Sequence, residues 1–260
     1  MSIRTKGASL LSNIAWNSCG SLVYLAANWL LTVLVVLFDQ SYTASGTLAV
    51  AMSVGNIAAT IVLFRTRTIQ VSDINNEYKS IDFIFLKILS SGLAIAICFI
   101  YSLFTVKPEC LWTVMLYVMF KISDSIVDAY HGIDQKHSRL DIAGKSQIIR
   151  GLLLVPAFAI AFKLFDSLNA SFIAMFALTL LTILFYDIPA SKRLEQISIE
   201  FNAKRIGSLV LVCVPGFIAG LLCTAVVSYA RQYYGFNIGT SSLGIYAAIA
   251  TPAVIVQALA

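Results

Sequence analysis

Long uninterrupted stretches of apolar residues recur along this chain, with shorter polar segments between them. Each stretch is long enough, or nearly so, to cross about 30 Å of hydrocarbon as an α-helix. Runs that are continuous rather than alternating favour helices over the strands of a membrane barrel. The pattern predicts eight membrane spans, at about 14–38, 42–64, 83–105, 111–130, 148–165, 170–188, 207–230 and 243–260.

The composition fits a protein that has the bilayer as its solvent. Of the 260 residues, 59% are hydrophobic and only 12% are charged, and the mean hydropathy is +0.85. In soluble domains roughly a quarter of all residues are charged. This composition therefore excludes a disordered chain, a coiled coil and an ordinary cytosolic enzyme. The five cysteines form no C-x-x-C pair and the two histidines no H-E-x-x-H motif, so we expect no metal site and no cofactor.

The basic residues are unevenly distributed between two alternating sets of connections. The longer set (1–13, 65–82, 131–147 and 189–206), with the nearby Arg150, holds thirteen lysines and arginines, whereas the shorter set and its flanks hold three, Lys107, Lys163 and Arg231. Loops rich in Lys and Arg stay in the cytoplasm. We therefore expect a multi-pass protein of the bacterial cytoplasmic membrane with a cytoplasmic N-terminus, and we expect no nucleic-acid partner despite the net charge of +5.

A faint internal repeat relates the second predicted span to the eighth. The run that begins at Gly46 resembles the run that begins at Gly244, an offset of 198 residues, which is about the length of six helices with their loops. Many transporters consist of two such units. The fold class that we predict is an all-α integral membrane bundle, with a six-helix lobe at 1–205 and the start of a second lobe at 206–260. We expect the chain to be a fragment of a longer protein.

Polar residues follow one face of the first two predicted helices. Their spacing of three and four residues places them on a single stripe, which in lipid turns toward other helices or toward water. The stripe therefore indicates either helix packing or the wall of a hydrophilic cavity. Its members include Asn13, Asn17, Ser21, Tyr24 and Asn28 in the first helix, and Ser45, Ser53, Asn56 and Thr60 in the second.

The fourth predicted span carries the strongest local signal, because Lys121, Asp124 and Asp128 are charged and lie within it. Placing one charge near the centre of a bilayer costs roughly 2.5–3.5 kcal/mol of insertion free energy. Three charges in one span therefore indicate pairing or a function that compensates this cost. Lys121 and Asp124 are three residues apart and can pair, whereas Asp124 and Asp128 lie on one face with like charge. The cluster is either a structural ion pair or part of a functional cavity.

Several motifs together resemble bacterial polysaccharide-biosynthesis membrane proteins, the flippases of lipid-linked oligosaccharides within the multidrug/oligosaccharidyl-lipid/polysaccharide exporter superfamily. The resemblance covers essentially the whole chain. The motifs are Arg67–Asp73 (Arg-Thr-Ile-Gln-Val-Ser-Asp), Lys121–Asp128 (Lys-Ile-Ser-Asp-Ser-Ile-Val-Asp), Gly132 with Gln135, Arg139–Ser146 with Arg150, and Asp187–Pro189 with Lys192.

The resemblance implies two six-helix lobes that face each other in a V around a central cavity. It also implies export of an undecaprenyl-diphosphate-linked repeat unit, for O-antigen, capsule or a similar polymer, with the polymerase machinery as a further expected partner. Cationic side chains would offset the diphosphate. The candidates are Lys121, Arg65, Arg67, Arg139, Lys145 and Arg150, although the last five could instead only set the topology.

Two other functions stay open. A cation-coupled multidrug exporter of the same superfamily would use acidic residues such as Asp124 in its cavity. A membrane prenyl- or phosphotransferase would bind a magnesium diphosphate through Asp124 and Asp128, and would be expected to offer a second aspartate-rich motif opposite them. We favour the flippase and expect no enzymatic activity.

Overall fold

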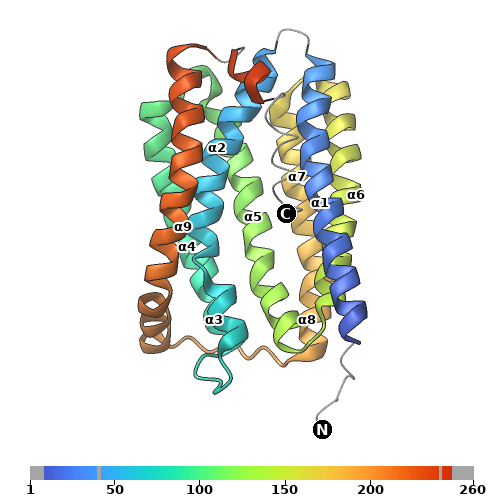
Figure 1. Cartoon of the computed structure of the whole chain (residues 1–260), viewed down its shortest axis with the longest axis vertical. Coiled ribbons are helices and arrows are strands. Elements are labelled where there is room, and N and C mark those ends of the chain that lie inside the picture. Colours follow the sequence, from blue (N-terminus) through green and yellow to red (C-terminus); the bar gives the residue numbers. More distant parts are fainter. Residues whose placement is uncertain (1–8, 40–41, 240–241, 248–260) are drawn as a thin grey trace.

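The structure is a computed structural model that describes residues 9–39, 42–239 and 242–247. All regular elements in these residues are helical, and most of them run along the long axis of the molecule (Figure 1). The elements are α1 (Leu10–Phe38), α2 (Thr43–Leu63), α3 (Thr66–Ser72), α4 (Ser80–Thr105), η1 (Pro108–Cys110), α5 (Leu111–Lys136), α6 (Leu140–Phe165), α7 (Leu168–Thr182), η2 (Ile183–Asp187), α8 (Ile188–Leu194) and α9 (Ala203–Asn237), and 242–247 are also helical.

The prediction of an all-α multi-span bundle is confirmed. Seven helical segments in the described residues are long and apolar enough to cross a membrane, and they correspond to the first seven predicted spans. Most of the eighth, from 248 onward, lies outside the described residues. The chain is therefore a multi-pass helical membrane protein, a class in which most backbone amides are paired within their own helix.

The basic connections contain more helix than the apolar runs predict. The segment 131–147 is almost wholly helical, because α5 continues to Lys136 and α6 begins at Leu140, and α3 and α8 lie within the other two described basic connections. Polar residues can extend a helix beyond the hydrocarbon, where hydropathy no longer reports it. We call the end of the bundle where these extensions lie, and where α1 begins, the basic end; it is at the bottom of Figure 1.

α5 lies at the centre of the bundle, with α2, α3, α4 and α9 on one side and α1, α6, α7 and α8 on the other (Figure 1). Small residues permit the closest crossings: a Cβ atom on Gly20 of α1 would lie 2.3 Å from the carbonyl oxygen of Gly144 in α6. Such contacts are typical of helices packed in lipid, where backbones approach at glycine.

Polar residues of α1 also hold it to α6. Asn13 donates to the Ser138 carbonyl and accepts from the Asp141 amide, and Ser21 donates to Gln147. This part of the predicted polar stripe therefore serves packing.

α9 is attached to the other side of the bundle at the basic end. The Arg205 guanidinium, in its first turn, donates two hydrogen bonds, of 3.0 and 3.3 Å, to the buried Asp82 carboxylate at the start of α4. Phe217 stacks on Phe64 with ring centroids 4.4 Å apart. Most of the rest of α9 is exposed, as expected for a helix that faces lipid or another helix outside the described residues.

Candidate functional site

A break between α2 and α3 creates the first part of the candidate site. Phe64 and Arg65 both have left-handed backbone conformations, with φ of 45° and 54°, so the helix stops and turns here. A broken helix leaves carbonyl groups without partners, and these need other donors in a membrane. The ammonium group of Lys87, on α4, donates to the Leu63 carbonyl at 3.2 Å and thereby satisfies one of them.

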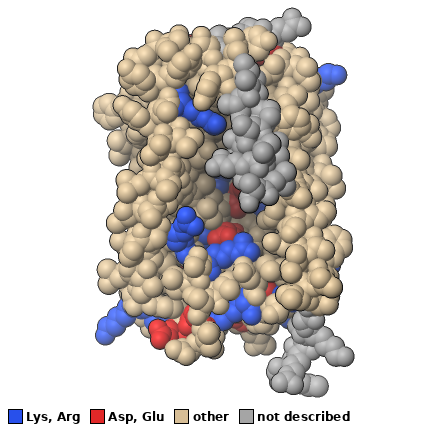
Figure 2. All heavy atoms as spheres, in the orientation of Figure 1, with Lys and Arg blue, Asp and Glu red and all other residues tan. Residues whose placement is uncertain are grey.

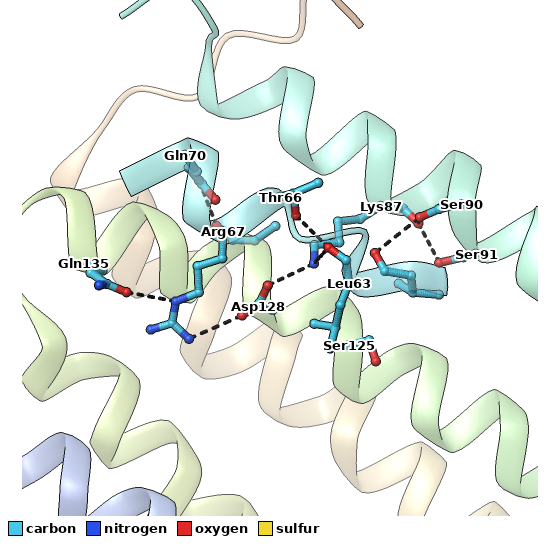
Figure 3. Close-up of polar contacts among 12 residues, drawn as sticks. Leu63, Thr66, Arg67, Gln70, Lys87, Ser90, Ser91, Ser125, Asp128 and Gln135 are labelled. Atoms are coloured by element: carbon cyan, nitrogen blue, oxygen red, sulfur yellow. Dashed lines mark hydrogen bonds and ion pairs between the residues drawn. The ribbon is translucent and has the colours of Figure 1, made fainter. Parts of the chain in front are cut away.

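Asp128 of α5 lies between two cations. One carboxylate oxygen accepts a 2.9 Å hydrogen bond from Lys87, whose side chain is completely buried, and the other lies 3.3 Å from the Arg67 guanidinium. Arg67 in turn donates to the Gln135 amide oxygen at 2.9 Å, about two helical turns further along α5. Figure 3 shows Asp128 between Arg67 and Lys87, with residues from α3, α4 and α5 brought together.

A pocket of about 480 Å³ opens beside this network. Arg65, Arg67, Asp128 and Gln135 line it together with four residues of α2 and α3. Arg65 forms no ion pair or hydrogen bond with any described residue, and its side chain lies against α9, where a Cβ atom on Gly220 would be 3.3 Å from the Arg65 Nε atom. The pocket and its surroundings thus hold more positive than negative charge: Arg67 and Lys87 pair with one carboxylate, and Arg65 lines the pocket without a partner among the described residues.

Asp124, one helical turn from Asp128, has different partners. It pairs closely with Arg150 of α6 and lies 3.8 Å from Lys121. Arg150 is almost fully buried and its guanidinium stacks on the Tyr24 ring, 5.2 Å from the ring centroid. Lys121 and Asp124 therefore form the i,i+3 pair that their spacing permits, and 15% of the Lys121 side chain is exposed.

Figure 2 shows that charged side chains gather in a hollow on one face of the molecule, between the side of α9 and the side of α1. They lie in the half of this face nearer the basic end. Two cations, Arg67 of α3 and Lys87 of α4, pair with Asp128 of α5, and Arg150 of α6 pairs with Asp124 of the same helix.

A third cluster was not predicted from the sequence. His131 and Asp134 of α5 are buried against Asp187 and Ser191, with the His131 Nε2 atom 3.5 Å from Asp187 and the Ser191 hydroxyl donating to Asp134 at 3.0 Å. Neither Asp187 oxygen has a hydrogen bond among the described residues. The motif Asp187-Ile-Pro189 can be recognised in the sequence, but its contact with His131 cannot.

The backbone around Asp187 has a local cause in Pro189. Proline has no amide hydrogen and its ring clashes with the carbonyl four residues earlier, so the regular pattern fails at this point. The Ile188 amide bonds to the Ile183 carbonyl instead, which widens Ile183–Asp187 into a turn of π-helix. Such turns often occur at functional sites.

The remaining predicted residues lie elsewhere. Arg139 and Lys145 line a different pocket with Asp141, between α6 and α8. Asn28 donates to the Tyr24 carbonyl within α1, Asn17 is half-buried near Gly144, and Asn56 is exposed on α2 one turn before Thr60, which contacts Thr224 of α9. The structure thus brings Lys121, Asp124 and Arg150 together, and separately Arg65, Arg67 and Asp128, but not all eleven candidates.

The described residues contain no group of three or more His, Cys, Asp or Glu side chains arranged to hold a metal ion. Comparison of the chain with known protein families, with curated proteins and with solved structures finds no match. The structural class, a multi-pass helical membrane protein with buried charges at its centre, therefore rests on the sequence and the fold.

Proposed function

We propose that this protein translocates an undecaprenyl-diphosphate-linked oligosaccharide repeat unit across the bacterial cytoplasmic membrane, for the synthesis of a surface polysaccharide such as O-antigen or capsule. The observation that supports it best is the excess of cations around the 480 Å³ pocket of Arg65, Arg67 and Asp128. The proposal assigns Arg65 and Arg67 to the diphosphate, and Lys87 and Asp128 to positioning Arg67.

The chemistry of the substrate fits this charge balance. A diphosphate-linked sugar carries negative charge and many hydroxyl groups, and its transfer through bare hydrocarbon would be prohibitive. Guanidinium groups bind phosphate oxygens through paired N–H donors, and a site with spare positive charge compensates the loss of water. The lipid tail would stay in the bilayer while the head group passes along the hollow in which charged side chains gather.

A contact between distant segments supports a two-lobe architecture. The segments that begin at Gly46 and Gly244 resemble each other, and they also touch: a Cβ atom on Gly244 would lie 2.9 Å from the Gly46 amide nitrogen, and Ser45 donates to the Gly244 carbonyl. Corresponding helices meet in this way when two repeats are related by an axis along the membrane normal. We propose lobes at 1–205 and from 206 onward, with the basic end and the N-terminus in the cytoplasm.

Complementation of a bacterial strain that lacks its own repeat-unit translocase tests the function. Arg67→Gln and Arg65→Gln should each lower surface polymer at least tenfold, while Arg231→Gln, near the far end of α9, should leave it unchanged. Membrane insertion of each variant is measured in parallel. Normal export by both pocket variants would contradict the proposal.

A direct binding experiment separates recognition from transport. Undecaprenyl diphosphate is titrated into the purified full chain in detergent, and its dissociation constant should rise about tenfold in Arg67→Gln but not in Arg231→Gln. Lys121→Ala should impair export while leaving membrane insertion intact, because a lysine within a span has no use in setting topology. Equal affinities in the two arginine variants would remove the pocket from the mechanism.

The buried Asp187 beside His131 favours a second candidate, the cation-coupled multidrug exporter. Intramembrane carboxylates without a fixed counter-ion commonly carry protons in transporters. Drug resistance on overexpression, lost in Asp187→Asn, would favour this function over the flippase. The transferase is less favoured, because Asp124 and Asp128 each face basic side chains rather than sharing an open site; magnesium-dependent turnover of a prenyl diphosphate would establish it instead.

A further inference from the structure

A second basic pocket lies on the outer side of the bundle at the basic end. It has a volume of about 280 Å³ and is bounded by the start of α6, by Tyr186 and by the last turns of α8. Arg139, Lys145 and Arg193 are its cations and Asp141 is its carboxylate. None of these residues lines the pocket of Arg65 and Arg67, so the two sites are distinct.

The internal ion pairs of this pocket leave positive charge unused. Asp141 accepts hydrogen bonds from the Arg139 guanidinium at 2.7 and 3.1 Å and from the Lys145 ammonium at 3.2 Å, so one carboxylate serves two cations. Arg193 is exposed and forms no ion pair or hydrogen bond with any described residue. An anion that entered would meet Arg193 together with the free N–H groups of its two neighbours.

The pocket opens toward the lipid that surrounds the bundle. Lys145 stands on the same face of α6 as the exposed Leu152 and Ile160, seven and fifteen residues further along. On the other wall, Leu184 and Phe185, which precede Tyr186, are 57% and 77% exposed. Apolar surface exposed to this degree at the level of the spans is surface for acyl chains.

The position along the membrane normal also suits a lipid head group. Lys145 lies over the ring of Trp16, which is partly exposed near the start of α1, with the ammonium 5.0 Å from the ring centroid. Tryptophan and basic side chains gather where hydrocarbon meets water, at the depth of the lipid phosphate groups. Basic pockets between spanning helices at this depth are a recognised mode of binding anionic lipids.

We infer that this pocket binds the phosphodiester head group of an anionic phospholipid, with Arg139, Lys145 and Arg193 around the phosphate and the acyl chains along α6 and α7. Tyr186 closes the inner wall, where its hydroxyl donates to the Ile142 carbonyl at 3.5 Å. The site is separate from the translocation pocket, and its occupancy can be measured without any transport assay.

The experiment compares two spin-labelled lipids at trace level, phosphatidylglycerol and phosphatidylcholine, in phosphatidylcholine vesicles that contain the full chain. The fraction of motionally restricted label reports association with the protein. A basic residue in contact with the head group contributes a preference for anionic lipid of about fivefold, so the wild type should favour phosphatidylglycerol by at least this factor. Equal association of the two lipids would overturn the site.

Two neighbouring residues of α8 provide a matched pair of variants. Arg193→Gln should lower the preference about fivefold because it removes the unpaired cation of the pocket, whereas Lys192→Gln, adjacent and exposed but not in the lining, should leave it unchanged. Equal losses in both variants would show general attraction to a basic surface and overturn the inference.

A soluble anion is distinguished by competition. Inorganic phosphate at millimolar concentration is compared with chloride at the same ionic strength. The restricted phosphatidylglycerol signal should be the same in both, since the anchored lipid is always at high local concentration. Selective displacement by phosphate, lost in Arg193→Gln, would identify free phosphate as the ligand and overturn the lipid assignment.

Discussion

Two charged clusters on neighbouring faces of α5 differ in their balance of charge. Around Asp128, one carboxylate has two cations within hydrogen-bond or ion-pair distance, and a third lines the adjoining pocket. Around Asp134, two carboxylates, one histidine and one serine are packed together, and Asp187 has no hydrogen bond among the described residues. The first cluster has positive charge available for a ligand, whereas the second has none.

The difference shows what each cluster can do in a membrane. Ion pairs with satisfied hydrogen bonds hold helices in position, and an excess of cations beside a pocket attracts an anion. In the second cluster the Asp187 carboxylate lies 3.5 Å from His131 and has no hydrogen bond among the described residues. The two faces of α5 therefore differ: one has cations to spare beside a pocket, whereas the other packs carboxylates against a histidine and a serine.

Among the variants that test this comparison, removal of the Lys87 ammonium should lower the free energy of unfolding most. Among the described residues, Lys87→Met leaves Asp128 with the half-exposed Arg67 alone within ion-pair distance and leaves the Leu63 carbonyl without its ammonium donor. A broken buried pair typically costs about 3 kcal/mol. This loss is measured as the change in the free energy of unfolding, by titration with SDS in mixed micelles. Lys163→Met, an exposed lysine of α6, is the control.

The double variant Lys87→Met/Asp128→Asn sharpens the interpretation. If the loss arises from an unpaired charge, neutralising its partner should restore at least half of it. A double variant as unstable as the sum of the two single ones would show that Lys87 acts through packing alone.

Ser191→Ala should have an intermediate effect, on the second cluster. It removes the hydrogen bond to Asp134, whose other oxygen already has none among the described residues, and a hydrogen bond of this kind contributes about 1 kcal/mol. The same titration measures the change. Ser198→Ala, in the exposed segment that follows α8, is the matched control, and equal stabilities of the two variants would contradict the prediction.

Asp187→Asn should have the smallest effect on stability, less than about 1 kcal/mol, because it replaces a carboxylate without a cation by a neutral group of the same shape. The comparison is with Asp128→Asn, which leaves the buried Lys87 unpaired and should cost about 3 kcal/mol. A loss of the same size in both variants would remove the distinction between the clusters.

Much of the fold could be predicted from the sequence because hydropathy acts over whole helices. Seven of the predicted spans appear as helices, and the charges of α5 were identified from the free-energy cost of placing them in lipid. The i,i+3 pair of Lys121 and Asp124 also follows from local geometry, since both residues belong to one helix.

The partners of these charges could not be predicted. Lys87 lies within the predicted span at 83–105, but its pairing with Asp128, forty-one positions along the chain, depends on how α4 packs against α5. Likewise, Arg139 and Lys145 were grouped with Arg65 and Arg67 because all are basic and near the same end. Only the packing of α6 beside α8 places them in a separate pocket.

From the order of residues alone it follows that the chain is helical, that it spans a membrane, and that a few ionisable residues within the spans need compensation. These properties follow from transfer free energies, which depend on residue type and on spacing along one helix. The tertiary structure decided which charge meets which, where cations outnumber carboxylates, and that Asp187 approaches His131. Those contacts join residues of different helices, and their distances are fixed by side-chain packing at the crossings, for which an apolar run carries no signal.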